Sequence, residues 1–100
     1  MDITKFLGYG VDNAVSRADL SRILNLPDRQ VRRLIAMARD RGELIVSSPY
    51  GDGYYLSDDE GELKRQYRTN RSRALSILRQ QRHIRNQIEE IHNQNQLKML

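Results

Sequence analysis

Arginine is the residue type in this chain whose abundance indicates a binding function, because its guanidinium group binds anions. The 100 residues include 17 Lys or Arg and 13 Asp or Glu, which gives a formal net charge of +4. Nearly all the bases are arginine, and a planar guanidinium matches phosphate oxygens and the guanine edge better than the point charge of lysine does. The composition therefore indicates a polyanionic partner.

The charged residues are segregated along the chain. Residues 17–41 carry a net charge of +4, residues 42–62 carry six acids and no base, and residues 63–85 carry eight bases and no acid. Two basic blocks thus flank one acidic block. Such blocks indicate separate charged surfaces on the folded protein.

Residues suited to catalysis or metal binding form no recognisable motif. The absence of cysteine excludes a disulfide framework, a thiolate nucleophile and any zinc site that contains cysteine. His83 and His92 belong to no metal-binding or catalytic pattern, and residues 51–53 lack the following helix and Lys-Ser or Lys-Thr of a phosphate-binding loop. We therefore expect no enzymatic activity, no metal and no cofactor.

The length and hydropathy of the chain are those of one small soluble domain. No segment provides the ~20 consecutive apolar residues that cross a bilayer, and the first residues lack the basic and then apolar pattern of a signal peptide. We expect a cytoplasmic protein without a membrane partner. The sequence indicates no small-molecule ligand.

Capping residues and apolar periodicity predict three helices before residue 42. Asp2, Ser16 and Asp28 can each accept hydrogen bonds from the free N–H groups of a helix N-terminus. A glycine or a proline follows each predicted helix within a few residues. The residues expected to be buried are Ile3, Phe6 and Leu7 in the first helix, Leu20, Ile23 and Leu24 in the second, and Val31, Leu34, Ile35 and Ala38 in the third.

The next segment has the features of a β-hairpin. Residues 44–46 and 54–56 are rich in strand-forming residues. Asp52-Gly53, between these segments, is typical of a hairpin turn, because glycine adopts a positive φ without steric cost. Residues 14–15 could add a third, very short strand. The predicted order of elements is that of a winged helix-turn-helix domain.

Four segments carry a resemblance to a known family. They are SRADL (16–20), LPDRQVRRLI (26–35), RGELI (41–45) and YGDGYYLS (50–57), and they resemble the biotin-repressor-type winged helix-turn-helix. In particular, the chain resembles small prophage-encoded winged-helix proteins, in which a glycine-tyrosine wing leads into an acidic turn and an arginine-rich helix. The resemblance covers about residues 3–85. It implies an α+β fold that is mostly helical and has a hairpin wing. It also implies a protein that binds DNA in the cytoplasm of a bacterial or phage-infected cell.

The third predicted helix has a basic face opposite its apolar face on a helical wheel. In helix-turn-helix docking the N-terminal part of this helix meets the bases, so Arg29, Gln30 and Arg33 are predicted to contact base edges. The small Ala36 would allow close approach. The predicted DNA-binding residues are Arg17, Arg29, Gln30, Arg32, Arg33, Ala36 and Tyr50, together with Lys64, Arg68 and Arg71 from the second basic block.

The C-terminal segment predicts one long helix from residue 58 to about 95, capped by Ser57 and frayed at the amides 93–96. Positions spaced alternately by four and three are mostly apolar, which favours a left-handed coiled coil and a homodimer. Asn70, Gln81 and Asn95 would be polar residues in this seam. The predicted dimerisation residues are Leu63, Tyr67, Ala74, Ile77, Gln81, Ile84, Ile88 and Ile91.

The sequence thus predicts a winged-helix domain over residues 1–57 and a long helix over 58–100. The expected function is that of a dimeric protein binding double-stranded DNA, as a transcriptional regulator or an accessory factor in DNA replication or packaging. The alternative is a protein-interaction adaptor that keeps the fold and docks an acidic partner. Salt dependence distinguishes the two, because phosphate contacts weaken steeply as salt rises.

Overall fold

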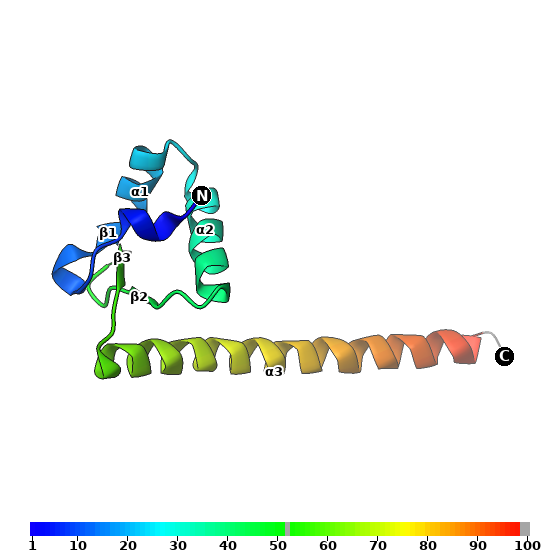
Figure 1. Cartoon of the computed structure of the whole chain (residues 1–100). Coiled ribbons are helices and arrows are strands. Elements are labelled where there is room, and N and C mark those ends of the chain that lie inside the picture. The colour runs from blue at the N-terminus through cyan, green and yellow to red at the C-terminus, as the bar shows by residue number, and fades with distance from the viewer. Residues whose placement is uncertain (52, 99–100) are drawn as a thin grey trace. The chain divides into compact units, whose positions relative to one another are not determined.

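The computed structural model describes residues 1–51 and 53–98 and is mostly helical (Figure 1). The chain divides into two compact units, Met1–Gln66 and Tyr67–Leu100. Within the described residues no helix combines the length and the apolar character needed to cross a membrane. The elements, in chain order, are the short 3-10 helices η1 (Ile3–Phe6) and η2 (Val11–Asn13), strand β1 (Val15–Ser16), helices α1 (Arg17–Leu24) and α2 (Asp28–Asp40), strands β2 (Ile45–Ser47) and β3 (Gly53–Leu56), and helix α3 (Glu60–Lys98).

The three strands form one antiparallel sheet in the order β1-β3-β2. The predicted hairpin is confirmed by the pairing of β2 with β3, and the predicted third strand by the pairing of Val15 with Tyr54. The backbone N–H of Ser48 donates to the carbonyl of Gly53 at 2.8 Å and closes the hairpin. The turn residue Asp52 lies outside the described residues. β3 is therefore the central strand, and β1 and β2 are the edges.

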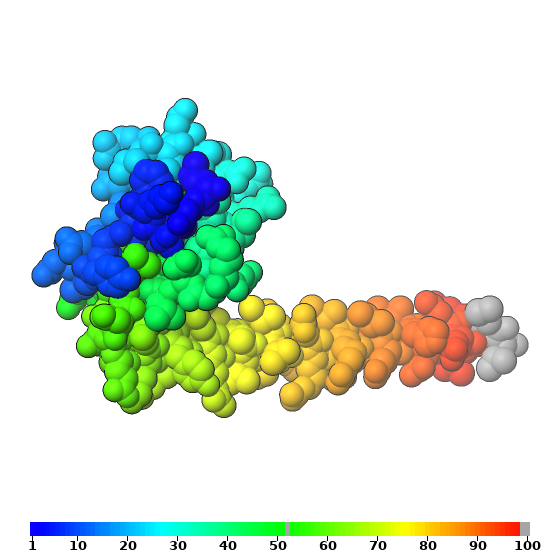
Figure 2. All heavy atoms as spheres, in the orientation of Figure 1, coloured from blue at the N-terminus to red at the C-terminus, as the bar shows by residue number. Residues whose placement is uncertain are grey.

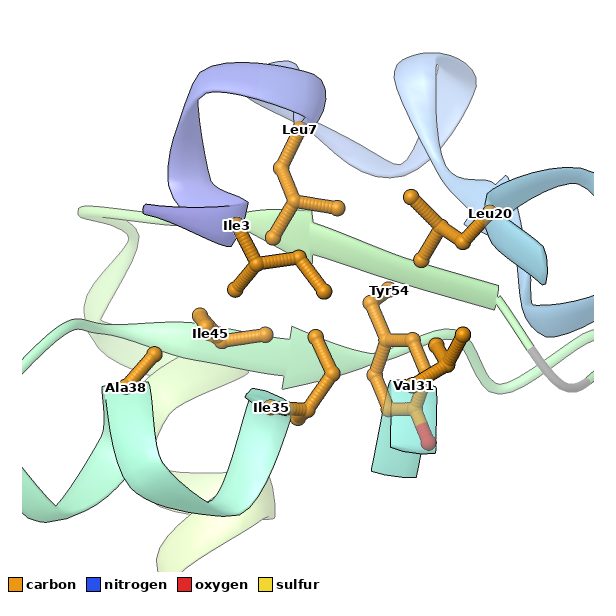
Figure 3. Packing of buried hydrophobic residues seen from close by; sticks show 8 residues of the cluster. All are labelled: Ile3, Leu7, Leu20, Val31, Ile35, Ala38, Ile45 and Tyr54. Atoms are coloured by element: carbon orange, nitrogen blue, oxygen red, sulfur yellow. The ribbon is translucent and has the colours of Figure 1, made fainter. Parts of the chain in front are cut away.

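The hydrophobic core lies between η1, α1, α2 and one face of the sheet (Figure 3). Leu24 and Leu34 pack against its margin, as predicted. Val46 and Tyr55, which alternate with core residues along their strands, are also buried. They belong to the other face of the sheet, where the first turns of α3 reach Tyr55. The core residues are Ile3, Leu7, Leu20, Val31, Ile35, Ala38, Ile45 and Tyr54.

Two residues predicted to be buried are exposed. Phe6 is 41% exposed because η1 is a single 3-10 turn that ends there. The chain continues in an extended conformation, which directs Leu7 into the core in its place. Ile23 is 54% exposed, because α1 is only eight residues long and packs through Leu20 and Leu24. A short helix covers less of its apolar stripe than the periodicity suggests.

The helix boundaries correct two predicted caps. Ser16 Oγ accepts a hydrogen bond from the N–H of Asp19 at 3.0 Å and caps α1, as predicted. α2, however, begins at Asp28 itself, so this residue is not a cap. α3 begins at Glu60, and Asp59 Oδ2 accepts from the N–H of Glu62 at 2.9 Å, so Asp59 has the capping role predicted for Ser57. Both predictions were wrong: α2 begins one residue earlier than predicted and α3 two residues later, an offset common for helix ends.

The ends of α2 and α3 also bear on the predictions. Gly42 has a φ of +98° directly after the last turn of α2, which confirms it as the stop. α3 continues to Lys98 and includes residues 93–96, for which fraying stays a prediction. Side-chain amides support this end, since Gln96 Nε2 lies 3.1 Å from His92 Nε2 one turn earlier.

Candidate nucleic-acid interface

A tight turn sets the relation between α1 and α2. Asn25 adopts the left-handed conformation (φ 54°) and ends α1, and the N–H of Leu26 donates to the carbonyl of Ser21 at 3.0 Å. The hydroxyl of Ser21 donates back to the carbonyl of Leu26. With this turn fixed, α2 buries Val31 and Ile35 and leaves its opposite face to solvent.

The solvent face of α2 brings together four of the residues predicted to bind DNA. Arg29, Arg33 and Ala36 follow one another at i, i+4 and i+7, and Gln30 lies beside them, so they form one stripe. All four are exposed. Within residues 1–51 and 53–98, neither Arg29 nor Arg33 takes part in an ion pair. Their guanidinium groups can therefore meet a phosphate or a base without first breaking a salt bridge.

Asp28 lies at the start of this stripe between two other predicted DNA-binding residues. Its Oδ1 is 3.0 Å from Arg17 Nε, and its Oδ2 is 3.0 Å from Arg32 Nε. A hydrogen bond to Tyr54 and the nearby Asp28 carboxylate raise the pKa of Arg17 above its usual value, so this side chain stays charged. The two arginines offset the one acid at the N-terminal end of α2, which would otherwise repel phosphate.

The tyrosines of the hairpin have separate positions. Tyr50, predicted to contact phosphate, is 87% exposed, and its N–H donates to Ser48 Oγ at 3.2 Å. Tyr54 and Tyr55 are both buried, one on each face of the sheet. The guanidinium of Arg39 lies 5.7 Å from the centre of the Tyr54 ring, a cation–π distance. Of the three, only Tyr50 has a ring free to reach a ligand.

Two arginines for which the sequence predicted no role, Arg39 and Arg65, donate hydrogen bonds to backbone carbonyls of the edge strand β2. Arg39 Nε donates to the carbonyl of Ile45 at 3.1 Å, and Arg65 Nη2 donates to the carbonyl of Ser47 at 2.9 Å. Gln66 Oε1 accepts from the N–H of Ser47 at 2.9 Å. Side chains thus satisfy backbone groups that an edge strand would otherwise offer to another strand. Periodicity could not identify these arginines, because their partners lie 6 to 18 residues away along the chain.

Arg65 also reaches the buried hydroxyl of Tyr55. Its Nη2 lies 3.3 Å from the Tyr55 oxygen. Burial raises the pKa of the Tyr55 hydroxyl above its usual value, and a hydrogen bond to Glu62 raises it further. Tyr55 therefore remains protonated at neutral pH and joins the first turns of α3 to the sheet. This group of residues stabilises the fold and is not part of the exposed stripe.

The remaining predicted DNA-binding residues lie on α3. Lys64 Nζ forms an ion pair with Glu60 at 2.8 Å, one turn earlier. Arg68 and Arg71, in the second unit, are exposed and form no ion pair within the described residues. The second basic block is therefore divided among an ion pair, an edge-strand contact through Arg65 and a run of exposed arginines beyond residue 66.

The predicted dimerisation residues are exposed along the second unit, with one difference. Leu63 is half-buried within the first unit, whereas every described residue from Tyr67 to Lys98 except Ser76 is exposed. Figure 2 shows the side chains of this helix as spheres, coloured from yellow to red along the chain. A shallow hollow on its surface is lined by Leu78, Gln81, Arg82, Ile84, Arg85 and Ile88. Because one helix provides the whole lining, the hollow is an open surface of mixed apolar, amide and basic side chains.

The described residues contain no group of three or more His, Asp or Glu side chains placed to hold a metal ion. Comparison with protein-family models, with curated proteins and with solved structures gave no match for this chain. The interpretation of the α2 surface therefore depends on its own residues and geometry.

Proposed function

We propose that the Met1–Gln66 unit is a winged-helix domain that binds duplex DNA, with α2 as the recognition helix. The order of elements supports this, because two short 3-10 helices and a strand precede two packed helices and a hairpin. The sheet order β1-β3-β2 places the hairpin beside the N-terminal strand, as a wing requires. In this reading the hairpin containing Tyr50 is the wing.

The exposed stripe of Arg29, Gln30, Arg33 and Ala36 is the observation that carries the proposal. The whole unit contains ten basic and eleven acidic residues, so its net charge gives no general attraction to DNA. The attraction must come from where the charges lie. Two exposed arginines outside any described ion pair, on the N-terminal half of a helix, suit bidentate contact with guanine or phosphate. Ala36 leaves room for the groove wall.

We infer that the protein acts by binding to a site on double-stranded DNA. A winged-helix domain with this exposed α2 surface would act by binding, as a transcriptional regulator or as an accessory factor in DNA replication or packaging. The resemblance of the sequence to small prophage-encoded winged-helix proteins agrees with this role. Both uses require the same α2 surface.

A binding titration of the full chain against a pool of random-sequence duplexes tests the proposal. With six or more phosphate contacts, affinity should fall by about a thousandfold or more between about 50 and 200 mM salt. Sequencing of the bound fraction should then show an enriched site. Absence of binding at the lower salt concentration would refute the proposal, and salt-independent binding would contradict phosphate contact.

A pair of matched variants localises the interface. Arg29→Ala should weaken binding to the enriched site, because it removes a contact at the N-terminal end of α2. Arg41→Ala removes the same charge from an exposed position at the other end of the same helix and should change affinity little. Equal losses in both variants would show that only total charge matters and would contradict the assignment of α2.

A further inference from the structure

Tyr54 is a core residue that carries a hydroxyl group, which the packing of an apolar core does not require. The residue is 9% exposed and belongs to the hydrophobic cluster. In Figure 3 its ring extends from β3 toward α2, with the hydroxyl oxygen at the far end of the ring. A buried hydroxyl needs a hydrogen-bond partner, so the partner of this oxygen indicates its role.

The partner of the hydroxyl is Arg17, the first residue of α1. The pairing of β1 with β3 places Val15 directly opposite Tyr54. Arg17 follows Val15 by two residues, and long side chains reach such diagonal neighbours across an antiparallel pair. Arg17 donates a hydrogen bond to the Tyr54 hydroxyl, and this bond is the first cause of the raised pKa of Arg17. The strand register and the hydrogen bond thus agree on this contact.

The same guanidinium group also contacts Asp28 at the start of α2. Its Nε donates to Asp28 Oδ1 at 3.0 Å, which leaves the two outer nitrogens for Tyr54 and for a ligand. The Arg17 side chain is 28% exposed, so most of it is covered and part of it reaches solvent. Arg17 is thus held from two sides, by a carboxylate on α2 and by a neutral hydroxyl on β3.

We propose that Tyr54 is a positioning residue, whose hydroxyl holds Arg17 ready for contact with one phosphate of duplex DNA. This inference rests on the proposed function and deepens it. An arginine side chain loses rotational freedom when it binds, and one that is held in place beforehand loses less. Asp28 also holds Arg17, but its negative charge repels phosphate, whereas the hydroxyl adds no charge. The contact raises affinity for all sequences alike, because phosphates carry no sequence information.

Removal of the hydroxyl oxygen tests the proposal in the full chain. Tyr54→Phe keeps the buried ring and should lower affinity for every duplex by about two- to tenfold, the usual cost of ordering one long side chain. Arg17→Ala should reduce the slope of log affinity against log salt by about one. In the double variant Tyr54→Phe should add no further loss, because the hydroxyl acts only through Arg17. Binding titrations at several salt concentrations measure all three variants.

The neighbouring residue provides a matched control. Tyr55 is also buried, and its hydroxyl contacts Arg65 on the other face of the sheet. Tyr55→Phe removes the same atom from the same strand and should leave both the affinity and the salt slope unchanged. Urea denaturation gives the stability of each variant. A loss of affinity that comes only from a weakened fold would then appear in both tyrosine variants.

The outcomes separate this inference from the proposed function. If the unaltered chain binds no duplex, both are overturned. If it binds, three results would overturn the positioning role alone: an unchanged affinity in Tyr54→Phe, an equal loss in Tyr55→Phe, or additive losses in the double variant. An unchanged salt slope in Arg17→Ala would also overturn it, because Arg17 would then contact no phosphate. A loss in Tyr54→Phe that disappears in the Arg17→Ala background supports the proposal.

Discussion

The two units of this chain use the same kinds of residue in opposite ways. The first unit buries its isoleucines and leucines in a core and contains ten bases and eleven acids. The second unit, Tyr67–Leu100, contains seven bases and two acids and exposes its isoleucines along a helix. The first unit has the interactions for a stable fold within one chain, whereas the apolar side chains of the second are exposed over residues 67–98. Position within an element, and not residue type, decides which role an isoleucine has.

The arginines of the two units also differ in their surroundings. In the first unit each arginine near α2 has a distinct environment, from the paired Arg17 and Arg32 to the exposed Arg29 and Arg33. In the second unit the arginines form a repetitive exposed run. Individually placed arginines suit the reading of particular bases, and a run of them suits sequence-independent attraction to the phosphate backbone. Four predictions test this contrast.

The largest expected effect concerns packing. Ile35→Ala removes a side chain that is 2% exposed and should lower the free energy of unfolding of the first unit by about 2–5 kcal/mol, because it leaves a cavity. Ile84→Ala removes a side chain that is 60% exposed and should leave that transition unchanged. Urea denaturation followed by near-ultraviolet circular dichroism compares the two. Equal destabilisation would contradict the division into units.

The next effect concerns base recognition. Arg33→Ala should reduce discrimination between the enriched DNA site and its single-base variants by about 1–3 kcal/mol, the usual value of one bidentate contact. Competition titrations with single-base variants of the site measure it. If Arg33→Ala weakens every duplex equally, Arg33 contacts phosphate and not a base.

A smaller effect is expected from the acid within the basic surface. Asp28→Asn removes a negative charge and releases Arg17 and Arg32, so affinity for any duplex should rise a few-fold, at a stability cost below about 1 kcal/mol for two partly exposed ion pairs. Asp40→Asn, at the other end of α2, is the control and should leave affinity nearly unchanged. A fall in affinity of Asp28→Asn would show that the ion pairs hold the two arginines in their binding positions.

The smallest effect is expected in the second unit. Arg68→Ala should weaken binding to all duplexes alike and reduce the slope of log affinity against log salt by about one, as the loss of one phosphate contact does. Discrimination between sequences should stay as it was. An unchanged slope would mean that the arginine run of the second unit faces solvent and not DNA.

Local patterns in the sequence were sufficient for much of the fold. The three-and-four spacing of Val31, Ile35 and Ala38 identified α2 and its buried face, and therefore also the basic face opposite. The strand-forming residues on both sides of residues 49–53 identified the hairpin. These predictions hold because helix and strand periods are properties of the backbone, so a repeat in sequence is also a repeat in space. Phe6 and Ile23 were mispredicted because short elements cover only part of their apolar stripe.

The sequence by itself determined which face of α2 is apolar and which is basic, because a helix of 3.6 residues per turn fixes that relation. It did not determine which arginines are available to a ligand. The tertiary structure decided that Arg39 and Arg65 bind the edge strand and that Arg17 and Arg32 share Asp28. The contacts of Arg65 and of Arg17 join residues 18 and 11 positions apart, and such distances are set by the packing of whole elements. For that reason the exposed pair Arg29 and Arg33 could be separated from the other arginines only in the folded chain.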